Sequence, residues 1–164
     1  MLAFADANGK IAYRGFHRFE LADGRVTLVW ARGYCFLEDG THLLDDEIST
    51  WVAAQLVNHS VAQLVPTMNG FFMLVVIWQN AGKIEVSSGR FESHPFYFAL
   101  QPDGLLFGDD YWELVRRLDA LHYNPQAALS MALMGYVANS QTLLSDLREV
   151  RPAAVTTFSL VNGN

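Results

Sequence analysis

The chain has 164 residues, of which 51% are hydrophobic and only 17% are charged. This composition excludes a disordered tail or a solvated linker, because such chains lack the apolar surface that offsets the entropy of ordering. The formal net charge of −6 at pH 7 argues against a nucleic-acid groove, which needs Lys and Arg to neutralise phosphates. The length fits one domain, which we expect to span residues 1–164.

Cysteine content and hydropathy indicate the compartment. The single cysteine, Cys35, excludes an internal disulfide framework and any Cys-rich metal site. The longest apolar run, residues 71–78, is much shorter than the roughly 20 residues of a membrane span. No basic region followed by an apolar stretch opens the chain. We therefore expect a cytoplasmic protein that binds neither a membrane nor nucleic acid.

The first part of the chain predicts strands. Residues 11–21 alternate loosely between apolar and polar side chains, which favours a strand. Asp23 and Gly24 then favour a turn, because Asp-Gly pairs adopt the positive φ angles of tight hairpins. Residues 26–36 are rich in β-branched and aromatic side chains and predict a second strand.

A helix is expected next. Asp45 and Asp46 stand at its start, where carboxylates suit the helix dipole and can cap free N–H groups. Apolar residues follow at helical spacing until residues 58–60, which form a plausible stop.

The middle of the chain predicts a buried sheet. Gly70 opens an almost wholly apolar strand over residues 71–78, and we expect this whole stretch to be buried on both faces. Further strands are expected at residues 83–88, 96–100 and 105–107.

The last third turns helical. Residues 110–118 begin with Asp110, and residues 125–134 begin with a proline at a favoured first-turn position. A short helical turn is expected at residues 141–147 and a closing strand at residues 154–160. We expect Trp112 and Tyr136 to lie in the core rather than on a face toward a partner domain. Strands, a helix, strands and then helices predict the α+β class.

Residues that carry chemistry are scattered. The chain has five histidines, His17, His42, His59, His94 and His122. Their spacing does not match that of metal ligands, so no metal site is expected. The chain has no GxSxG, GxxxxGKS or GxGxxG motif. Strand alternation places Arg32 on the face opposite Cys35, so we expect an inert, buried thiol rather than a reactive one.

Four motifs in order resemble a known family. Residues 68–78 resemble the L-x-G-x-F-A-F-x-L-W-D strand of class II glutamine amidotransferase domains, above all the amino-terminal domain of asparagine synthetases and related amide ligases. Residues 89–98 resemble the R-D-x-x-G-x-x-P-L-Y-Y stretch, and residues 104–110 resemble the F-A-S-E strand that leads into a helix. Residues 144–152 are similar to F-x-G-I-x-x-L-P-P-G, which ends that domain. The resemblance covers residues 68–160 well and the first half loosely.

The resemblance implies a four-layer αββα sandwich of the N-terminal nucleophile hydrolase type. In active members, the cysteine after the initiator Met attacks the glutamine amide, and its own α-amine acts as the base. An α-amine suits this role because its pKa of about 7.7–8 lies close to working pH.

The chain departs from the family at the residues that react. Leu2 stands at the nucleophile position, so no catalytic residue is expected. The remaining counterparts imply a vestigial pocket. Arg32 and Gly33 stand where the family has the Asn-Gly pair that holds the oxyanion, and Asp46 corresponds to the aspartate that binds the glutamine amine. Arg90 corresponds to the arginine of the R-D motif, whose aspartate is replaced by Phe91. Such losses are not compensated by leftover binding residues, because catalytic groups act as a unit.

Three hypotheses follow. The first is a catalytically degenerate domain with a structural or interaction role, forming the N-terminal part of an ATP-dependent amide ligase such as a β-lactam synthetase or lasso-peptide cyclase. Its partner would be the synthetase domain of the same protein or a second copy. ATP and Mg would belong to that synthetase domain, since these residues lack an S-G-G-x-D-S loop, and this domain itself would need no cofactor. The second is a residual glutamine amidohydrolase that uses Cys35 or a cleaved terminus, and the third is a free-standing binding domain.

Overall fold

The computed structural model describes residues 2–6, 11–13, 15–90 and 94–159. The chain divides into two compact units: unit 1 comprises Met1–Arg14 and Pro95–Arg151, and unit 2 comprises Gly15–His94 and Pro152–Asn164. Each unit has an antiparallel sheet with accompanying helices, which confirms the predicted α+β class. The prediction of one domain over residues 1–164 stays a prediction.

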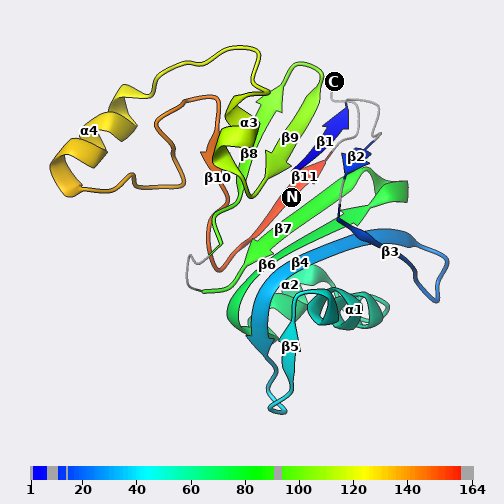
Figure 1. Cartoon of the computed structure of the whole chain (residues 1–164). Helices are drawn as coiled ribbons and strands as arrows, with labels where there is room; N and C mark the ends of the chain where they lie inside the picture. The colour runs from blue at the N-terminus through cyan, green and yellow to red at the C-terminus, as the bar shows by residue number, and fades with distance from the viewer. Residues whose placement is uncertain (1, 7–10, 14, 91–93, 160–164) are drawn as a thin grey trace. The chain divides into compact units, whose positions relative to one another are not determined.

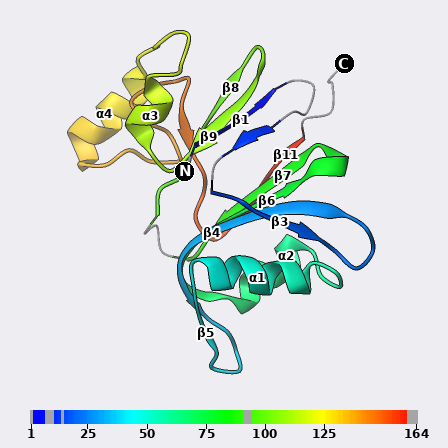
Figure 2. The same cartoon turned by 45° about the vertical axis from the view of Figure 1, so that its right-hand side comes forward.

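Unit 2 holds a sheet with the strand order β11-β7-β6-β4-β3 and with β5 paired to the end of β4. Its elements are β3 (His17–Glu20), β4 (Val26–Phe36), β5 (His42–Leu44), α1 (Asp46–Gln55), α2 (Val61–Leu64), β6 (Asn69–Trp78), β7 (Lys83–Ser88) and β11 (Val155–Ser159). Both α1 and α2 lie against one face of this sheet, and the β4–β5 hairpin extends away from it (Figures 1 and 2). The strands predicted at residues 26–36 and 83–88 are confirmed. The closing strand predicted at residues 154–160 is present as Val155–Ser159, because Ala154 precedes the strand and Leu160 lies outside the described residues.

Strand β6 is central in this sheet, between β4 and β7. Its residues 72–77 are all buried, as the consecutive apolar run predicts. On one face, Phe72, Leu74 and Val76 pack in a core with Ile48 and Val52 of α1. The prediction is wrong at the two ends of the strand, because Gly70 and Trp78 are half-buried and Phe71 is 36% exposed.

Unit 1 holds a sheet with the strand order β10-β8-β9-β1-β2. Its elements are β1 (Leu2–Asp6), β2 (Ile11–Tyr13), β8 (Tyr97–Gln101), β9 (Gly104–Gly108), α3 (Tyr111–Val115), α4 (Pro125–Met134) and β10 (Arg148–Glu149). Helix α3 packs on β8 and β9 through a small core that includes Ala99, Leu106, Leu114 and Leu147. In both views, α4 stands away from the strands of its own unit (Figures 1 and 2).

The strand predicted over residues 11–21 is wrong as a single element. The structure has two short strands there, β2 and β3, which belong to different sheets. Gly15 lies between them with φ +86°, a conformation outside the extended region that a continuous strand requires.

The helical turn predicted over residues 141–147 is also wrong. Isolated bridges pair Gln141 with Arg148 and Tyr123 with Leu144 in this stretch. The Thr142 hydroxyl accepts the Leu144 N–H at 3.1 Å and donates to the Leu147 carbonyl at 2.8 Å. Such local side-chain bonds offer the backbone an alternative to a helix.

Helix α4 has clear caps and little burial. The Asn124 side chain accepts the Ala127 N–H at 3.1 Å, and Gly135 ends the helix in the left-handed region. Within α4, only Ala127 is buried. Trp112, in α3, is 66% exposed and Tyr136, just after α4, is 58% exposed, so the core position predicted for both aromatics is wrong.

Candidate functional site

Gly33, one of the predicted site residues, forms two hydrogen bonds with Asp45. The Gly33 N–H donates to Oδ1 of Asp45 at 2.7 Å, and the Asp45 N–H donates to the Gly33 carbonyl at 2.9 Å. Asp45 stands at the N-cap position of α1, but its side chain makes no capping bond, so the predicted cap is wrong. The carboxylate instead joins the start of α1 to β4.

Three glycines let the backbones around Gly33 approach unusually closely. A Cβ atom on Gly33 would overlap the Phe71 carbonyl oxygen and lie 2.9 Å from Nε2 of His94. A Cβ on Gly70 would overlap the Tyr34 carbonyl oxygen, and a Cβ on Gly89 would overlap the carbonyl oxygen of Gly70. Gly33 and Gly70 also have positive φ angles, +104° and +147°. The glycines therefore permit a backbone packing that no other residue allows at these positions.

The Asp46 side chain contacts His17 rather than Gly33. Its Oδ1 lies 3.0 Å from Nε2 of His17, and its side chain is 76% exposed. The residue predicted to bind a substrate amine is therefore a solvent-facing carboxylate in the first turn of α1 that is engaged by His17.

The other predicted residues are spread over the fold. Arg32 is exposed on β4 while Cys35 is buried, which confirms that they occupy opposite faces. Arg90 is exposed and follows Gly89 directly, and Phe91 lies outside the described residues. Leu2 lies in β1 of unit 1, paired in register with Gly108.

The structure thus brings Gly33 together with Asp45, which the sequence indicated only as a helix cap, and with His94, to which it assigned no role. The position of Gly33 inside the strand predicted at residues 26–36 was a sequence signal for the close approach of another backbone. A glycine inside a predicted strand often marks a place where another backbone comes near.

Cys35 is an unreactive core residue. It is 1% exposed and packs in the core between the sheet and α1. Burial raises the pKa of the Cys35 thiol to about 11. Because the thiolate is the nucleophile, a thiol with this pKa stays protonated at neutral pH. The predicted burial is confirmed.

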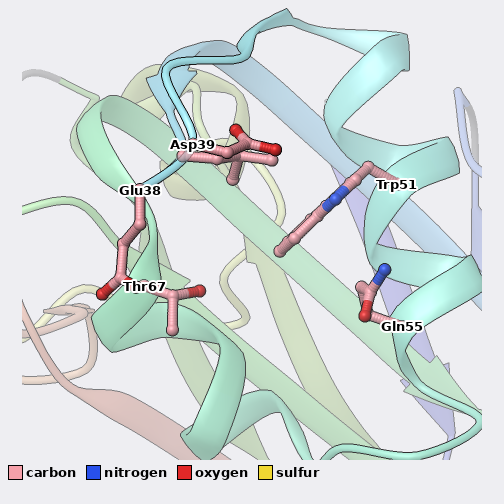
Figure 3. Close-up of a pocket in the computed structure, with 6 residues that line it drawn as sticks. Glu38, Asp39, Trp51, Gln55 and Thr67 are labelled. Carbon is pink, nitrogen blue, oxygen red and sulfur yellow. The ribbon is translucent and has the colours of Figure 1, made fainter.

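An open pocket of about 310 Å³ lies beside α1 (Figure 3). It is lined by Leu37, Glu38, Asp39, Trp51, Gln55 and Thr67. The Trp51 ring projects from α1 toward the turn that carries Glu38 and Asp39 (Figure 3). The Thr41 N–H donates to Asp39 Oδ1 at 2.9 Å and holds the pKa of Asp39 below its usual value. Two carboxylates beside an indole ring suit a positively charged group.

A second pocket, of about 440 Å³, surrounds Trp78. The Trp78 Nε1–H donates to Oε2 of Glu85 at 2.6 Å, and Nζ of Lys83 donates to Oε1 at 2.8 Å. The Arg25 guanidinium lies 5.0 Å from the centre of the Trp78 ring. Both oxygens of the buried Glu85 carboxylate are therefore satisfied from within the protein, and we assign this network a structural role.

In unit 1, a serine, a histidine and an aspartate are neighbours. Nδ1 of His122 lies 3.0 Å from Oδ1 of Asp146, and the His122 N–H donates to Oδ2 at 2.8 Å. The side-chain bond with His122, together with this backbone bond, holds the pKa of Asp146 below its usual value. The Ser145 hydroxyl donates to the His122 carbonyl at 3.1 Å rather than to the imidazole. The group therefore ties two loops together and lacks the nucleophile–base contact of a hydrolase.

Among the residues that the structure describes, no group of three or more His, Cys, Asp or Glu side chains could hold a metal ion. Within the same residues, no helix has the length and apolar character that crossing a bilayer requires.

The fold and site define an α+β protein with antiparallel sheets and a glycine-lined strand contact beside a helix start. Comparison with protein-family models and with curated proteins gave no match to this chain. The amidotransferase resemblance therefore rests on the residues of the sequence, and the family is a proposal.

Proposed function

We propose that the chain is a catalytically degenerate class II glutamine amidotransferase-like domain. In this proposal, the two antiparallel sheets stack as a four-layer αββα sandwich of the N-terminal nucleophile hydrolase type. The domain has a structural or interaction role in an asparagine synthetase-like, ATP-dependent amide ligase of the cytoplasm. ATP and Mg act in the synthetase domain, and this domain binds no cofactor. The α+β class and the helices packed on one face of each sheet support the fold.

The observation that carries the proposal is the contact between Gly33 and Asp45. In the resemblance, Arg32 and Gly33 take the place of the Asn-Gly pair that stabilises the oxyanion. An oxyanion hole needs N–H donors that are free to point at the developing negative charge. The Gly33 N–H is already engaged by the Asp45 carboxylate at 2.7 Å, and a carboxylate at this place also repels an oxyanion.

Two further observations support a degenerate site. Asp46, the counterpart of the amine-binding aspartate, is engaged by His17. Leu2, at the nucleophile position, has no group that could attack an amide. The alternative nucleophile, Cys35, is buried with a pKa of about 11, which weighs against a residual amidohydrolase that uses it.

The first test incubates the purified chain with glutamine and measures released glutamate and ammonia. We expect no release above a protein-free blank, and the same result for Cys35→Ala. Glutamate release by the wild-type chain that disappears in Cys35→Ala would overturn the proposal and establish the amidohydrolase.

A second test restores the nucleophile by Leu2→Cys, with removal of the initiator Met confirmed by mass spectrometry. We expect this variant to stay inactive, because the Gly33 N–H is still engaged by Asp45. Glutamine hydrolysis by Leu2→Cys would show that only the nucleophile is missing and that the pocket is intact.

The role in a ligase is tested by reading the coding sequence after Asn164. An S-G-G-x-D-S motif in the residues that follow supports the ligase. A stop codon directly after Asn164 contradicts it and favours a free-standing binding domain.

A further inference from the structure

The pocket beside α1 has a wall that is held in place from within unit 2. Trp51 and Gln55 are four residues apart, so they project from the same face of α1 into the pocket (Figure 3). The Trp51 ring is half-buried and packs against the core, as does Leu37 on the other side of the pocket. Part of the indole ring is therefore fixed by packing, while the rest faces the pocket. A ring that is already ordered loses little entropy when a ligand binds to it.

The turn that carries Glu38 and Asp39 is ordered as well. The Leu37 N–H donates to the Thr41 carbonyl at 2.9 Å, and the Gly40 N–H donates to the Leu37 carbonyl at 3.0 Å. The Thr41 N–H donates to Oδ1 of Asp39 at 2.9 Å. These bonds fix the backbone of the turn, so both carboxylates are presented from a preorganised segment.

The polar groups of the pocket are mainly acceptors. Glu38 makes no hydrogen bond or ion pair with any residue that the structure describes, and Asp39 is engaged only on the side of Thr41. The Thr67 hydroxyl donates to the Leu64 carbonyl at 2.8 Å, so its oxygen can only accept a further bond. None of the six residues that line the pocket is Lys, Arg or His. The pocket therefore suits a cation that brings its own N–H donors.

One indole ring with two carboxylates distinguishes between kinds of cation. A quaternary ammonium has no N–H to donate and is bound by cages of aromatic rings, whereas a single ring lines this pocket. A primary ammonium is strongly hydrated, so it loses more on leaving water. A guanidinium is planar, stacks on an indole and donates N–H groups to carboxylates in a fixed fork. The volume of about 310 Å³ is at the lower end for ligand pockets, which favours a small ligand or one end of a longer ligand.

We propose that this pocket binds the guanidinium group of a small organic cation. The group stacks on Trp51 and donates to the carboxylates of Glu38 and Asp39. The proposal requires neither the amidotransferase resemblance nor the proposed function, because none of the residues on which those depend lines the pocket.

The test titrates the isotope-labelled full chain with methylguanidinium chloride at constant ionic strength and follows its N–H signals by NMR. We expect saturable shifts of the Trp51 indole and of residues 37–39. The expected Kd is about 1 mM, because a cation–π contact and exposed ion pairs each contribute little. Tetramethylammonium has the same charge without N–H donors, and it should bind about 10-fold more weakly or worse.

Two matched variants show whether the pocket or the acidic surface attracts the ligand. Glu38→Gln should raise the Kd about fivefold, the upper range for one exposed ion pair. The control is Glu20→Gln, in β3 of the same unit, because Glu20 is also exposed, has no ion pair among the described residues and lies outside the pocket. Both variants remove one negative charge, so non-specific attraction falls equally. The control should keep the wild-type Kd.

The proposal is overturned if methylguanidinium gives no saturable shift of these signals. It is also overturned if tetramethylammonium binds equally well, or if both variants raise the Kd equally, because the ligand would then respond to charge alone. N-acetyl-argininamide identifies the source of the guanidinium once the site is established. Binding at least as tight as that of methylguanidinium supports the site and assigns it to an arginine side chain of a peptide. Weaker binding supports the same site with a free alkylguanidinium as its ligand.

Discussion

Gly33 has a positive φ angle, no room for a Cβ atom and an N–H group bonded to Asp45, and only glycine fits this combination. Its φ angle of +104° lies in the region that glycine favours, and the Phe71 carbonyl and the His94 ring leave no room for a Cβ atom. Its N–H donates to Asp45. The same residue therefore positions β4 against β6 and takes part in the contact that occupies the proposed oxyanion donor.

We predict that Gly33→Ala destabilises unit 2 strongly. Gly40→Ala is the matched control, because Gly40 has φ +84° but nothing lies within 4 Å of a Cβ placed there. The control should lose about 1–2 kcal/mol from backbone strain alone, and Gly33→Ala at least about 2 kcal/mol more from the clash. Urea unfolding measures both losses. Equal losses would mean that the backbones near Gly33 can separate at no cost.

We predict that Cys35 makes stability fall at high pH. Its pKa rises from an ordinary 9.0 to about 11 in the folded protein, so folding favours the protonated thiol. This contribution is complete below pH 9 and is lost as the pH rises toward 11, a difference of about 2–3 kcal/mol. Stability curves of the wild type and Cys35→Ala should therefore converge over this window. Parallel curves would show that the thiol titrates normally in the folded chain.

At the scale of elements, β6 shows how burial alternates with exposure at a strand end. Phe71 is 36% exposed and its ring contacts that of Tyr34, whereas Phe72 is 1% exposed in the core against α1. Two adjacent residues of the same type therefore occupy very different environments.

This difference gives a prediction with an internal control. Phe72→Ala should cost about 3–5 kcal/mol of unfolding free energy, because it leaves a cavity in the core. Phe71→Ala should cost less than about 2 kcal/mol, because water already reaches that ring. Chemical denaturation compares the two variants. Similar costs would contradict the register of β6 against β4.

Long, strongly patterned elements could be predicted from the sequence. Strands β4 and β7 and helix α4 match the expected residues 26–36, 83–88 and 125–134. Strand β5 has only three residues, too few to show a pattern of its own. Strands β1 and β10 could not be predicted, because each pairs with a strand far away in the sequence, β9 and β8 respectively. The change of sheet between β2 and β3 depends on tertiary structure for the same reason.

The candidate site could be predicted only in part. Gly33 was identified through the resemblance, but its partner Asp45 is 12 residues away, and the nearby Asp46 was selected instead. The pairing of Asp46 with His17, 29 residues apart, depends on how α1 lies beside β3 and β4. Local propensity gives no information on such contacts, because side-chain direction at a helix start is set by the loop that enters it.

The distribution of tryptophans affects how unfolding can be followed. Trp30, Trp51 and Trp78 lie half-buried in unit 2, whereas the fourth tryptophan of the chain, Trp112, lies in unit 1 and is 66% exposed. Because Trp112 already faces water, its emission should change little when its surroundings melt. A fluorescence-detected transition therefore reports on the unit built around β4 and β6, and a spectroscopic label on the other unit is needed to learn whether the two melt together.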